Sequence, residues 1–172
     1  SANEIKAWTT SNRLIGSVFG EFKISNNLKF RSSWSTDFSD VKDDQYFSPI
    51  TADASAVSGR AYTSDFQQLT WLNENIFTYD KKWGANTLNA IAGFTQQETK
   101  STFNSLSGQG FPSGSGLENL SSAAVITKGT ATGTSFGIVS WLGRVNVDLQ
   151  GKYLLSATIR TDGSSRFAST DR

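Results

Sequence analysis

The sequence predicts an all-β fold, an antiparallel up-and-down meander of about six strands, each running for roughly the length of a membrane-spanning strand. Three observations predict it. Apolar and polar residues alternate at period two in several stretches, as in strands with one apolar and one polar face. Short turns join these stretches in pairs. Long polar connections separate the pairs, so that short and long connections alternate along the chain.

The clearest pair is a hairpin formed by residues 136–149 and 153–161 around the turn Gln150-Gly151-Lys152. If the turn holds these three residues, apolar side chains face apolar side chains throughout, and a slip of one residue would destroy the match. The predicted facing pairs are Leu149–Tyr153, Val147–Leu155, Val145–Ala157, Gly143–Ile159 and, on the polar side, Arg144–Thr158.

Two further hairpins precede this one in the chain. Residues 13–24 and 28–41 form the first, around Ser25-Asn26-Asn27, with Phe22 facing Phe30 and Val18 facing Trp34. Residues 66–80 and 87–100 form the second. Both parities of 66–80 carry apolar residues, and we expect the aromatic parity, with Trp71 and Phe77, to face outward. Residues 42–65 and 101–135 are predicted long connections, and residues 1–12 a loop end.

The order of connection lengths favours a membrane barrel over a soluble sandwich. The predicted short turns lie at 25–27, 81–86 and 150–152, and the long connections at 42–65, 101–135 and from 162 onward. Outer-membrane barrels sort their loops in this way, with short periplasmic turns and long extracellular loops. Because the smallest known barrels have about eight strands, residues 1–172 are predicted to form a partial transmembrane β-barrel domain, an arc of something larger.

Composition argues against several other classes. Lys and Arg number 16 against 15 Asp and Glu, which does not suggest the concentrated basic face of a nucleic-acid binder. The chain has no Cys and no His, which excludes a disulfide scaffold, a thiolate zinc site and a Ser-His-Asp triad. No catalytic residue, metal or cofactor is predicted. No apolar run approaches the roughly 20 residues of a membrane helix, and residues 1–20 do not resemble a signal peptide. The absence of Met predicts that the chain begins inside a longer product or after processing.

Several segments of the chain carry a family resemblance. The clearest is the run Trp141-Leu142-Gly143-Arg144-Val145-Asn146, then Lys152-Tyr153-Leu154-Leu155, then Arg160-Thr161-Asp162-Gly163-Ser164-Ser165-Arg166-Phe167. It is similar to LGRVNY…KYLL…RRDGSSRF, a signature of the SusC-like TonB-dependent transporters. Trp71-Leu72-Asn73-Glu74-Asn75, Ala92-Gly93-Phe94 and Gly110-Phe111-Pro112 resemble family segments in the same order. Thr161 departs from a frequent basic residue, and the sequence stops at Arg172, where the family continues into further strands.

The resemblance implies an internal fragment of a barrel of about 22 strands with a plugged lumen, in the outer membrane of a Gram-negative bacterium. Such transporters import large nutrients such as oligosaccharides or peptides, driven by TonB. A SusD-like surface lipoprotein usually caps the extracellular mouth. The expected partners are therefore outer-membrane lipid, a SusD-like lipoprotein, the cargo, and TonB through parts of the parent chain not present here. No enzyme activity and no nucleic-acid partner are expected.

On this interpretation the residues fall into three groups. The residues expected to face lipid are Leu14, Val18, Phe22, Phe30, Trp34, Val145, Val147, Leu149, Tyr153, Leu155 and Ile159. Those expected to face the lumen, and to contact a plug rather than cargo, are Arg144, Asn146, Asp148, Thr158 and Arg160. Those expected in loops, either facing substrate or packing loops on one another, are Tyr46, Phe47, Tyr62, Phe103, Phe111 and Arg166.

Other interpretations of the same residues stay open. A water-soluble antiparallel β-sandwich acting as a carbohydrate-binding module would use Trp34, Trp71 and Trp141 as its core. A β-rich hydrolase fits poorly, because no two carboxylates have a convincing catalytic spacing. The cluster Asp37, Asp40, Asp43 and Asp44 could hold Ca²⁺ through carboxylate oxygens. It lacks the spacing of a calcium loop, so solvated charges are favoured.

Overall fold

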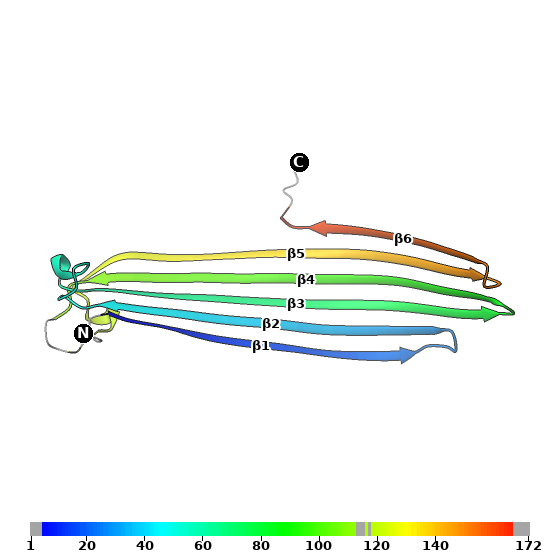
Figure 1. Cartoon of the computed structure of the whole chain (residues 1–172), viewed down its shortest axis with the longest axis horizontal. Coiled ribbons are helices and arrows are strands. Elements are labelled where there is room, and N and C mark those ends of the chain that lie inside the picture. Colours follow the sequence, from blue (N-terminus) through cyan, green and yellow to red (C-terminus); the bar gives the residue numbers. More distant parts are fainter. Residues whose placement is uncertain (1–4, 113–115, 117, 167–172) are drawn as a thin grey trace. The chain divides into compact units, whose positions relative to one another are not determined.

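The computed structural model describes residues 5–112, 116 and 118–166, which form a six-stranded sheet in the order β1-β2-β3-β4-β5-β6 (Figure 1). Each strand pairs with its sequence neighbours, which confirms the predicted antiparallel meander. The elements are β1 (Ile5–Lys23), β2 (Leu28–Phe47), η1 (Ser55–Val57), β3 (Arg60–Trp83), β4 (Asn86–Gln109), η2 (Leu120–Ser122), β5 (Val125–Leu149) and β6 (Tyr153–Ser164).

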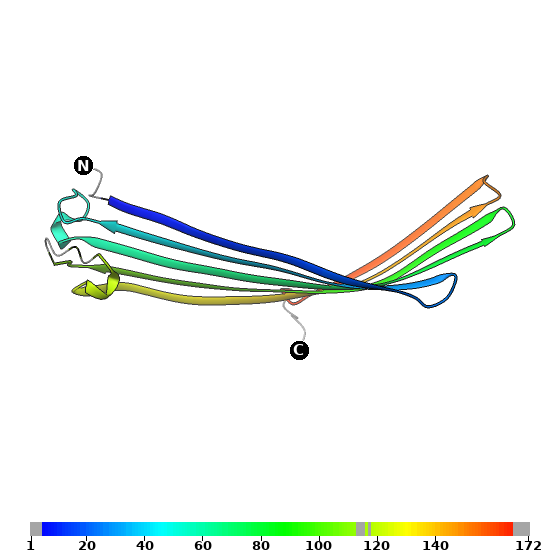
Figure 2. The same cartoon turned by 90° about the horizontal axis from the view of Figure 1, so that it is seen from below.

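The chain divides into two compact units. Unit 1 comprises Ser1–Leu14, Phe38–Leu69 and Lys100–Thr134, and unit 2 comprises Ile15–Asp37, Thr70–Thr99 and Ser135–Arg172. Unit 1 holds both long connections of the described chain, between β2 and β3 and between β4 and β5. Unit 2 holds the three short hairpin turns, which can be followed in Figure 2 at the ends of β1, β3 and β5. The predicted sorting of short and long connections is therefore present.

The strands in unit 1 are longer than predicted. β1 begins at Ile5 rather than at 13, and the long connections shrink from 42–65 and 101–135 to residues 48–59 and 110–124. The extensions carry polar residues on both faces, for example Ser101 and Thr102 in β4, among scattered large side chains such as Phe103, so they show no regular alternation of apolar and polar residues. Backbone pairing with neighbouring strands holds such segments extended, whatever their side chains.

The β5–β6 ladder has the predicted register. Leu149 pairs with Tyr153, Val147 with Leu155, and the three other predicted pairs follow in the same ladder. The turn is closed by a hydrogen bond from Lys152 N to Leu149 O at 3.0 Å, and by one from Gly151 N to Asp148 Oδ1 at 2.9 Å. Gly151 adopts a φ of 67°, a conformation that favours glycine and explains its place in the turn.

The β1–β2 hairpin and strand β3 also follow the predicted pattern in unit 2. Ile24 N donates to Leu28 O at 2.9 Å, and the Phe22 and Phe30 rings lie 6.4 Å apart. On β3, the Phe77 ring lies 4.7 Å from that of Phe30. The aromatic parity of β3 therefore shares a face with the apolar residues of β2, as expected.

The buried apolar core of the described residues is small and lies in unit 1, where Tyr46, Ala61 and Phe111 form a cluster that Leu120 and Ala123 pack against. In unit 2, the proposed core of the sandwich alternative is not buried: Trp34 is 53% and Trp141 60% exposed. The sandwich interpretation is wrong for this chain, because no second sheet among the described residues covers these side chains.

Candidate lipid-facing and polar surfaces

One face of unit 2 exposes a row of large apolar side chains. Ile159 is 74%, Val18 66% and Leu155 60% exposed. Phe30, Val147 and Leu149 are half-buried between their neighbours on the same strands. The remaining predicted lipid-facing residues, all exposed, are Leu14 in unit 1 and, in unit 2, Phe22, Trp34, Val145 and Tyr153. Exposed apolar area of this extent needs a cover in a stable protein.

Aromatic rings connect neighbouring strands across this face. Trp34 on β2 lies 6.0 Å from Trp71 on β3, with the rings stacked at 27°. Phe94 on β4 lies 4.6 Å from Trp141 on β5. Such cross-strand ring pairs stabilise a sheet beyond the area that they bury. These ring pairs therefore hold neighbouring strands together on a face that no other sheet of the described residues covers.

Polar side chains also lie on this aromatic face, and Glu98, Ser135, Asn73 and Asn75 find partners within the chain. The Trp71 indole donates to Glu98 Oε2 at 3.1 Å, and Ser135 donates to Glu98 Oε1 at 3.2 Å. Asn73, only 8% exposed, donates to Ser33 O at 3.1 Å and accepts from Asn75 at 2.6 Å. The sequence analysis did not single out Glu98. Glu98 and Phe94 are four residues apart on β4, so alternation along the strand places both on the same face.

The opposite face of unit 2 brings together four of the five predicted lumen-facing residues. Arg144 Nε donates to Thr158 Oγ1 at 3.3 Å, and Asn146 Nδ2 donates to Asn89 Oδ1 at 3.2 Å. Arg160 pairs with Asp162 at 2.9 Å. The fifth predicted residue, Asp148, instead holds the β5–β6 turn through the Gly151 amide. The result is a ladder of polar side chains across β4, β5 and β6.

This opposite face is not uniformly polar. On β1, Ile15 is 65% and Phe19 61% exposed, and the Arg31 guanidinium lies 4.2 Å from the centre of the Phe19 ring. Leu154 on β6 is 81% exposed. The cation–π contact leaves much of the Phe19 ring open. The sequence pattern already showed Ile15 and Phe19 on this parity, and the structure keeps them there.

The predicted loop aromatics are mostly in strands. Tyr46 and Phe47 end β2, while Tyr62 lies in β3 and Phe103 in β4, because the strands extend into the regions expected to be loops. Phe111 does lie in a connection, but it is 3% exposed, and its ring meets that of Tyr46 edge-to-face at 5.2 Å. Packing of connections on strands therefore explains Tyr46 and Phe111. Arg166 lies over the Phe136 ring, 3.7 Å from its centre.

The two long connections of unit 1 are joined into one tip. Phe111 N donates to Ser58 O at 2.7 Å, and Gly110 N donates to Gly59 O at 3.1 Å. Lys6 of β1 pairs with Glu118 at 2.6 Å. A Cβ added to Gly59 would lie 3.3 Å from the Phe111 ring, and its φ of 94° is one that glycine adopts readily. Backbone pairing, the aromatic cluster and an ion pair thus hold the tip together.

Tyr46 makes the stability of this tip dependent on pH. Burial raises the pKa of its phenol above the ordinary value of 10.0, and the nearby Glu118 carboxylate raises it further, against a smaller lowering by Lys6. Because the folded pKa exceeds the unfolded one, the packing of neutral Tyr46 stabilises the tip fully below about pH 10, and this stabilisation is lost as pH rises further.

We expect faster amide exchange around Phe111 above that pH, corrected for intrinsic exchange rates. Tyr46→Phe should abolish this extra loss, and an unchanged loss in the variant would contradict it.

The acidic cluster on β2 does not form a metal site. Asp43 accepts a hydrogen bond from Thr9, and Asp44 accepts one from Thr63 at 2.6 Å and pairs with Lys42 at 3.4 Å. Among residues 5–112, 116 and 118–166, no group of three or more acidic, His or Cys side chains is placed to hold a metal ion. Neither short helical turn of the described chain could cross a bilayer.

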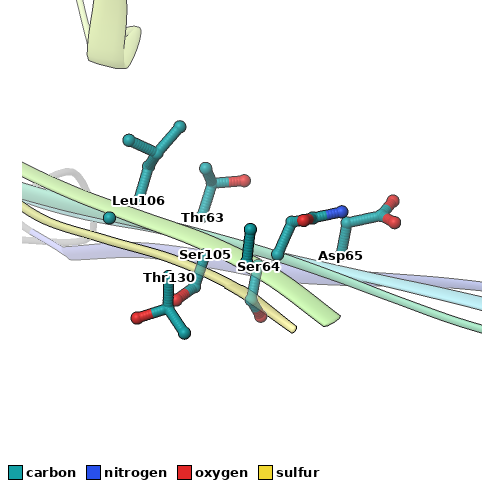
Figure 3. A pocket seen from close by; sticks show the side chains of 9 residues that line it. Thr63, Ser64, Asp65, Ser105, Leu106 and Thr130 are labelled. Carbon is teal, nitrogen blue, oxygen red and sulfur yellow. The ribbon is translucent and has the colours of Figure 1, made fainter. Parts of the chain in front are cut away.

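A hollow of about 610 Å³ lies in unit 1, across β3, β4 and β5. Figure 3 shows that Leu106 and Thr63 point to one side of these strands and Thr130 to the other. The lining side chains therefore do not converge on a single point. A polar hollow of about 370 Å³ lies in the same unit, lined by Trp8, Lys42 and Asp44 among others.

Comparison with curated proteins confirms the resemblance read from the sequence. The chain is 30% identical to TonB-dependent receptor P3 of Formosa agariphila over 128 residues, which is 73% of this chain and 13% of that protein. It is 28% identical to receptor P26 of the same organism over 170 residues, 95% of this chain and 17% of that protein. Its identity to TonB-dependent receptor SusC of Bacteroides thetaiotaomicron is 33% over 105 residues, 59% of this chain. No family model matches the chain.

Solved structures show the same fold. The RagAB peptide importer in its open-open state matches with a TM-score of 0.89 at 19% identity, over 99% of this chain and 19% of that one. The ferric citrate transporter FecA matches with a TM-score of 0.55 at 10% identity, over 91% of this chain. The meander therefore corresponds to part of a transporter barrel. The chain spans less than one-fifth of each curated relative named here, and their names describe receptors rather than enzymes.

Proposed function

We infer that this chain is a segment of a SusC-like TonB-dependent receptor, and we propose that it forms barrel wall and extracellular loops of an importer in the outer membrane of a Gram-negative bacterium. The observation that carries the proposal is the exposed apolar face of unit 2, which has a polar face behind it on the same strands. Membrane barrels place such faces against lipid and lumen respectively.

Lipid is the cover that best fits the apolar face. In hydrocarbon every backbone polar group must be paired within the protein, and neighbouring strands of the sheet pair these groups except along its outer edges at β1 and β6, which neighbouring strands of a complete barrel would pair. Polar side chains on this face must be satisfied as well, and Asn73, Asn75 and Glu98 have partners within the chain. The Trp71 indole bonded to Glu98 has the character of an interfacial tryptophan, which buries its rings in lipid and keeps its N–H hydrogen-bonded.

The polar face would line the lumen, where a plug domain needs polar partners. We propose that Arg144, Asn146, Thr158 and Arg160 contact the plug, with Asp148 supporting the turn beneath them. The exposed rings and aliphatic chains of Phe19, Ile15 and Leu154 support a protein neighbour rather than open water on this side.

The proposed partners and cargo follow from the relatives. RagAB is named as a peptide importer and SusC as a TonB-dependent receptor. We propose import of large nutrients, oligosaccharides or peptides, energised through TonB by parts of the receptor outside this chain. The joined tip of unit 1 would lie on the extracellular side, where a SusD-like lipoprotein would dock.

Depth-dependent quenching of tryptophan fluorescence tests the lipid contact. Variants of the intact receptor would keep only Trp34, only Trp141 or only Trp8, each reconstituted in bilayers with brominated acyl chains. Trp34 and Trp141 should lose at least half of their emission, because bromine quenches only on close contact. Trp8, in unit 1, serves as the matched control and should change little. Equal emission of Trp34 and Trp141 with and without bromine would exclude lipid from this face.

A further inference from the structure

Three of the sequence motifs meet on strand β5. The segment Trp141-Leu142-Gly143-Arg144 lies within β5 itself. Ala92-Gly93-Phe94 lies on β4, and the motif that begins at Arg160 lies on β6 and in the turn after it. Phe167, the last residue of that motif, is outside the described residues. Neither the proposed lipid contact nor the polar ladder explains why the motifs converge.

On the β4 side, contacts on both faces of the sheet fix how β4 aligns with β5. A Cβ placed on Gly93 would lie 2.9 Å from Leu142 Cγ, which is closer than Cβ contacts allow, so Leu142 occupies the space that glycine leaves empty. One residue further along each strand, the Phe94 and Trp141 rings pack at 4.6 Å. Adjacent residues of a strand point to opposite faces. A slip of one residue would therefore break both contacts together.

On the β6 side, a similar fit is followed by a cap. A Cβ on Gly143 would lie 3.3 Å from Ile159 Cγ2, and Arg160 reaches Ser140 Oγ at 3.5 Å. The ladder then stops. Ser165 N donates to Gly137 O at 3.0 Å, and Gly137 N donates to the Ser165 hydroxyl at 2.8 Å instead of to a backbone carbonyl.

Arg166 completes the cap at this end of β6. Its guanidinium lies 3.7 Å from the centre of the Phe136 ring. Phe136 and Arg166 are the residues next to Gly137 and Ser165, which the two hydrogen bonds join. Among the described residues, the ladder pairs β6 with the part of β5 from Ile138 to Leu149. The motif therefore ends the pairing of β6 at a defined residue, while β5 continues back to Val125.

The sequence of the first half of β5 explains why such contacts are needed. Residues 127–137 read TKGTATGTSFG, with Gly129, Ala131 and Gly133 on one parity and Thr130, Thr132 and Thr134 on the other. Strands that are rich in glycine and polar on both sides specify their register weakly and are prone to slip. The hydrogen bonds of Thr134 to Ser101 and of Ser135 to Glu98 join polar side chains that a shifted strand could replace with similar ones, so a stronger determinant of the alignment is needed elsewhere on β5.

We propose that the three motifs are a register lock for β4, β5 and β6. The space above Gly93 holds the Leu142 side chain and sets the alignment of β4 with β5. Ser165 and Arg166 end the pairing of β6 with β5 opposite Gly137. The role belongs to assembly of the sheet and does not depend on what the receptor imports.

A knob-and-hole exchange in the intact receptor tests the β4 side. Gly93→Leu should lower the protease-resistant folded fraction by about tenfold, since two leucines cannot share the site. The double variant Gly93→Leu with Leu142→Gly moves the knob to β4 and the hole to β5, and should recover to within about threefold of the parent. Ala90→Leu, on the same strand with the opposite parity, is the control and should change the fraction little.

Two results would overturn the lock. One is a folded fraction for Gly93→Leu equal to that of the Ala90→Leu control. The other is a double variant that recovers no better than Gly93→Leu alone, which would show that Leu142 does not fill the space above Gly93. Because the second result compares two variants with the same substitution at 93, it holds even if Gly93→Leu fails to fold.

Hydrogen exchange tests the β6 cap separately. Ser165→Ala combined with Arg166→Ala should speed amide exchange at Val139 and Gly163 by about tenfold, because these two residues form the next hydrogen-bonded pair of the ladder and losing the bonds beyond them lets the strand end fray. Exchange at Leu149 and Tyr153, at the turn end of the same ladder, should stay unchanged. Unchanged exchange at Val139 and Gly163, or equal acceleration at both ends, would show that the motif does not cap the strand.

Discussion

Replacing Leu155 by Arg should lower the free energy of unfolding of the intact receptor in bilayers by about 2 kcal/mol, because a lipid-facing arginine costs about 2–4 kcal/mol at the bilayer midplane and less toward the turn end of β6, where Leu155 lies. Leu155 is 60% exposed and pairs with Val147 on the apolar face of unit 2. In water such an exposed site would accept a charge with little change. The size of the loss therefore reports whether hydrocarbon covers the face. Urea titration of the receptor in vesicles, followed by tryptophan emission, gives the value.

Ser156→Arg is the matched control, one residue away on the same strand and on the opposite face. Ser156 donates to Asn146 Oδ1 at 2.7 Å within the polar ladder, so its replacement should cost about 1 kcal/mol, the value of one hydrogen bond. Equal losses for the two variants would mean that both faces of β6 meet the same environment. The lipid assignment would then fail.

Phe111→Ala should destabilise the tip of unit 1 by about 3–5 kcal/mol, as expected for truncating a buried aromatic ring. The ring is 3% exposed, packs edge-to-face on Tyr46, and lies close to Gly59. Its loss leaves a cavity between the two connections. Limited proteolysis should cut residues 48–59 and 110–124 much faster in the variant, while amide exchange in the hairpin turns of unit 2 stays unchanged.

Ile50→Ala provides the comparison for this tip. Ile50 lies in the same pair of connections but is 72% exposed, so its replacement should change stability by less than about 0.5 kcal/mol. If Phe111→Ala were as mild, Phe111 would not be a structural residue of the tip, and its ring would be free for the ligand contact that the sequence also allowed.

Sequence reasoning reached furthest where one face of a strand is apolar and the other polar. The β5–β6 register followed from matching Val147 with Leu155 and Leu149 with Tyr153, because a slip would turn apolar side chains to the wrong face. The shared face of Phe30 and Phe77 followed from the same rule. These features depend on period-two patterning, which the sequence states directly.

The remaining features depend on contacts between residues far apart in the chain. The parts of β1, β4 and β5 that belong to unit 1 carry polar residues on both faces, so the sequence pattern did not predict that they are strands. The edge-to-face packing of Tyr46 and Phe111 joins residues that are separated by most of β3 and β4. The place of Glu98 beside Trp71 required the β3–β4 alignment, which the mixed pattern of residues 66–80 did not give.

The separation of long connections into unit 1 and short turns into unit 2 has a consequence for how such a chain can vary over time. Exposed loops tolerate insertions and substitutions far better than tight turns, whose dihedral angles and registers are fixed. Residues such as Ile50, and others on the outside of the tip, can therefore diversify without disturbing Gly151 or the hairpin that it closes. One scaffold can in this way present many different outer surfaces while its folding instructions stay the same.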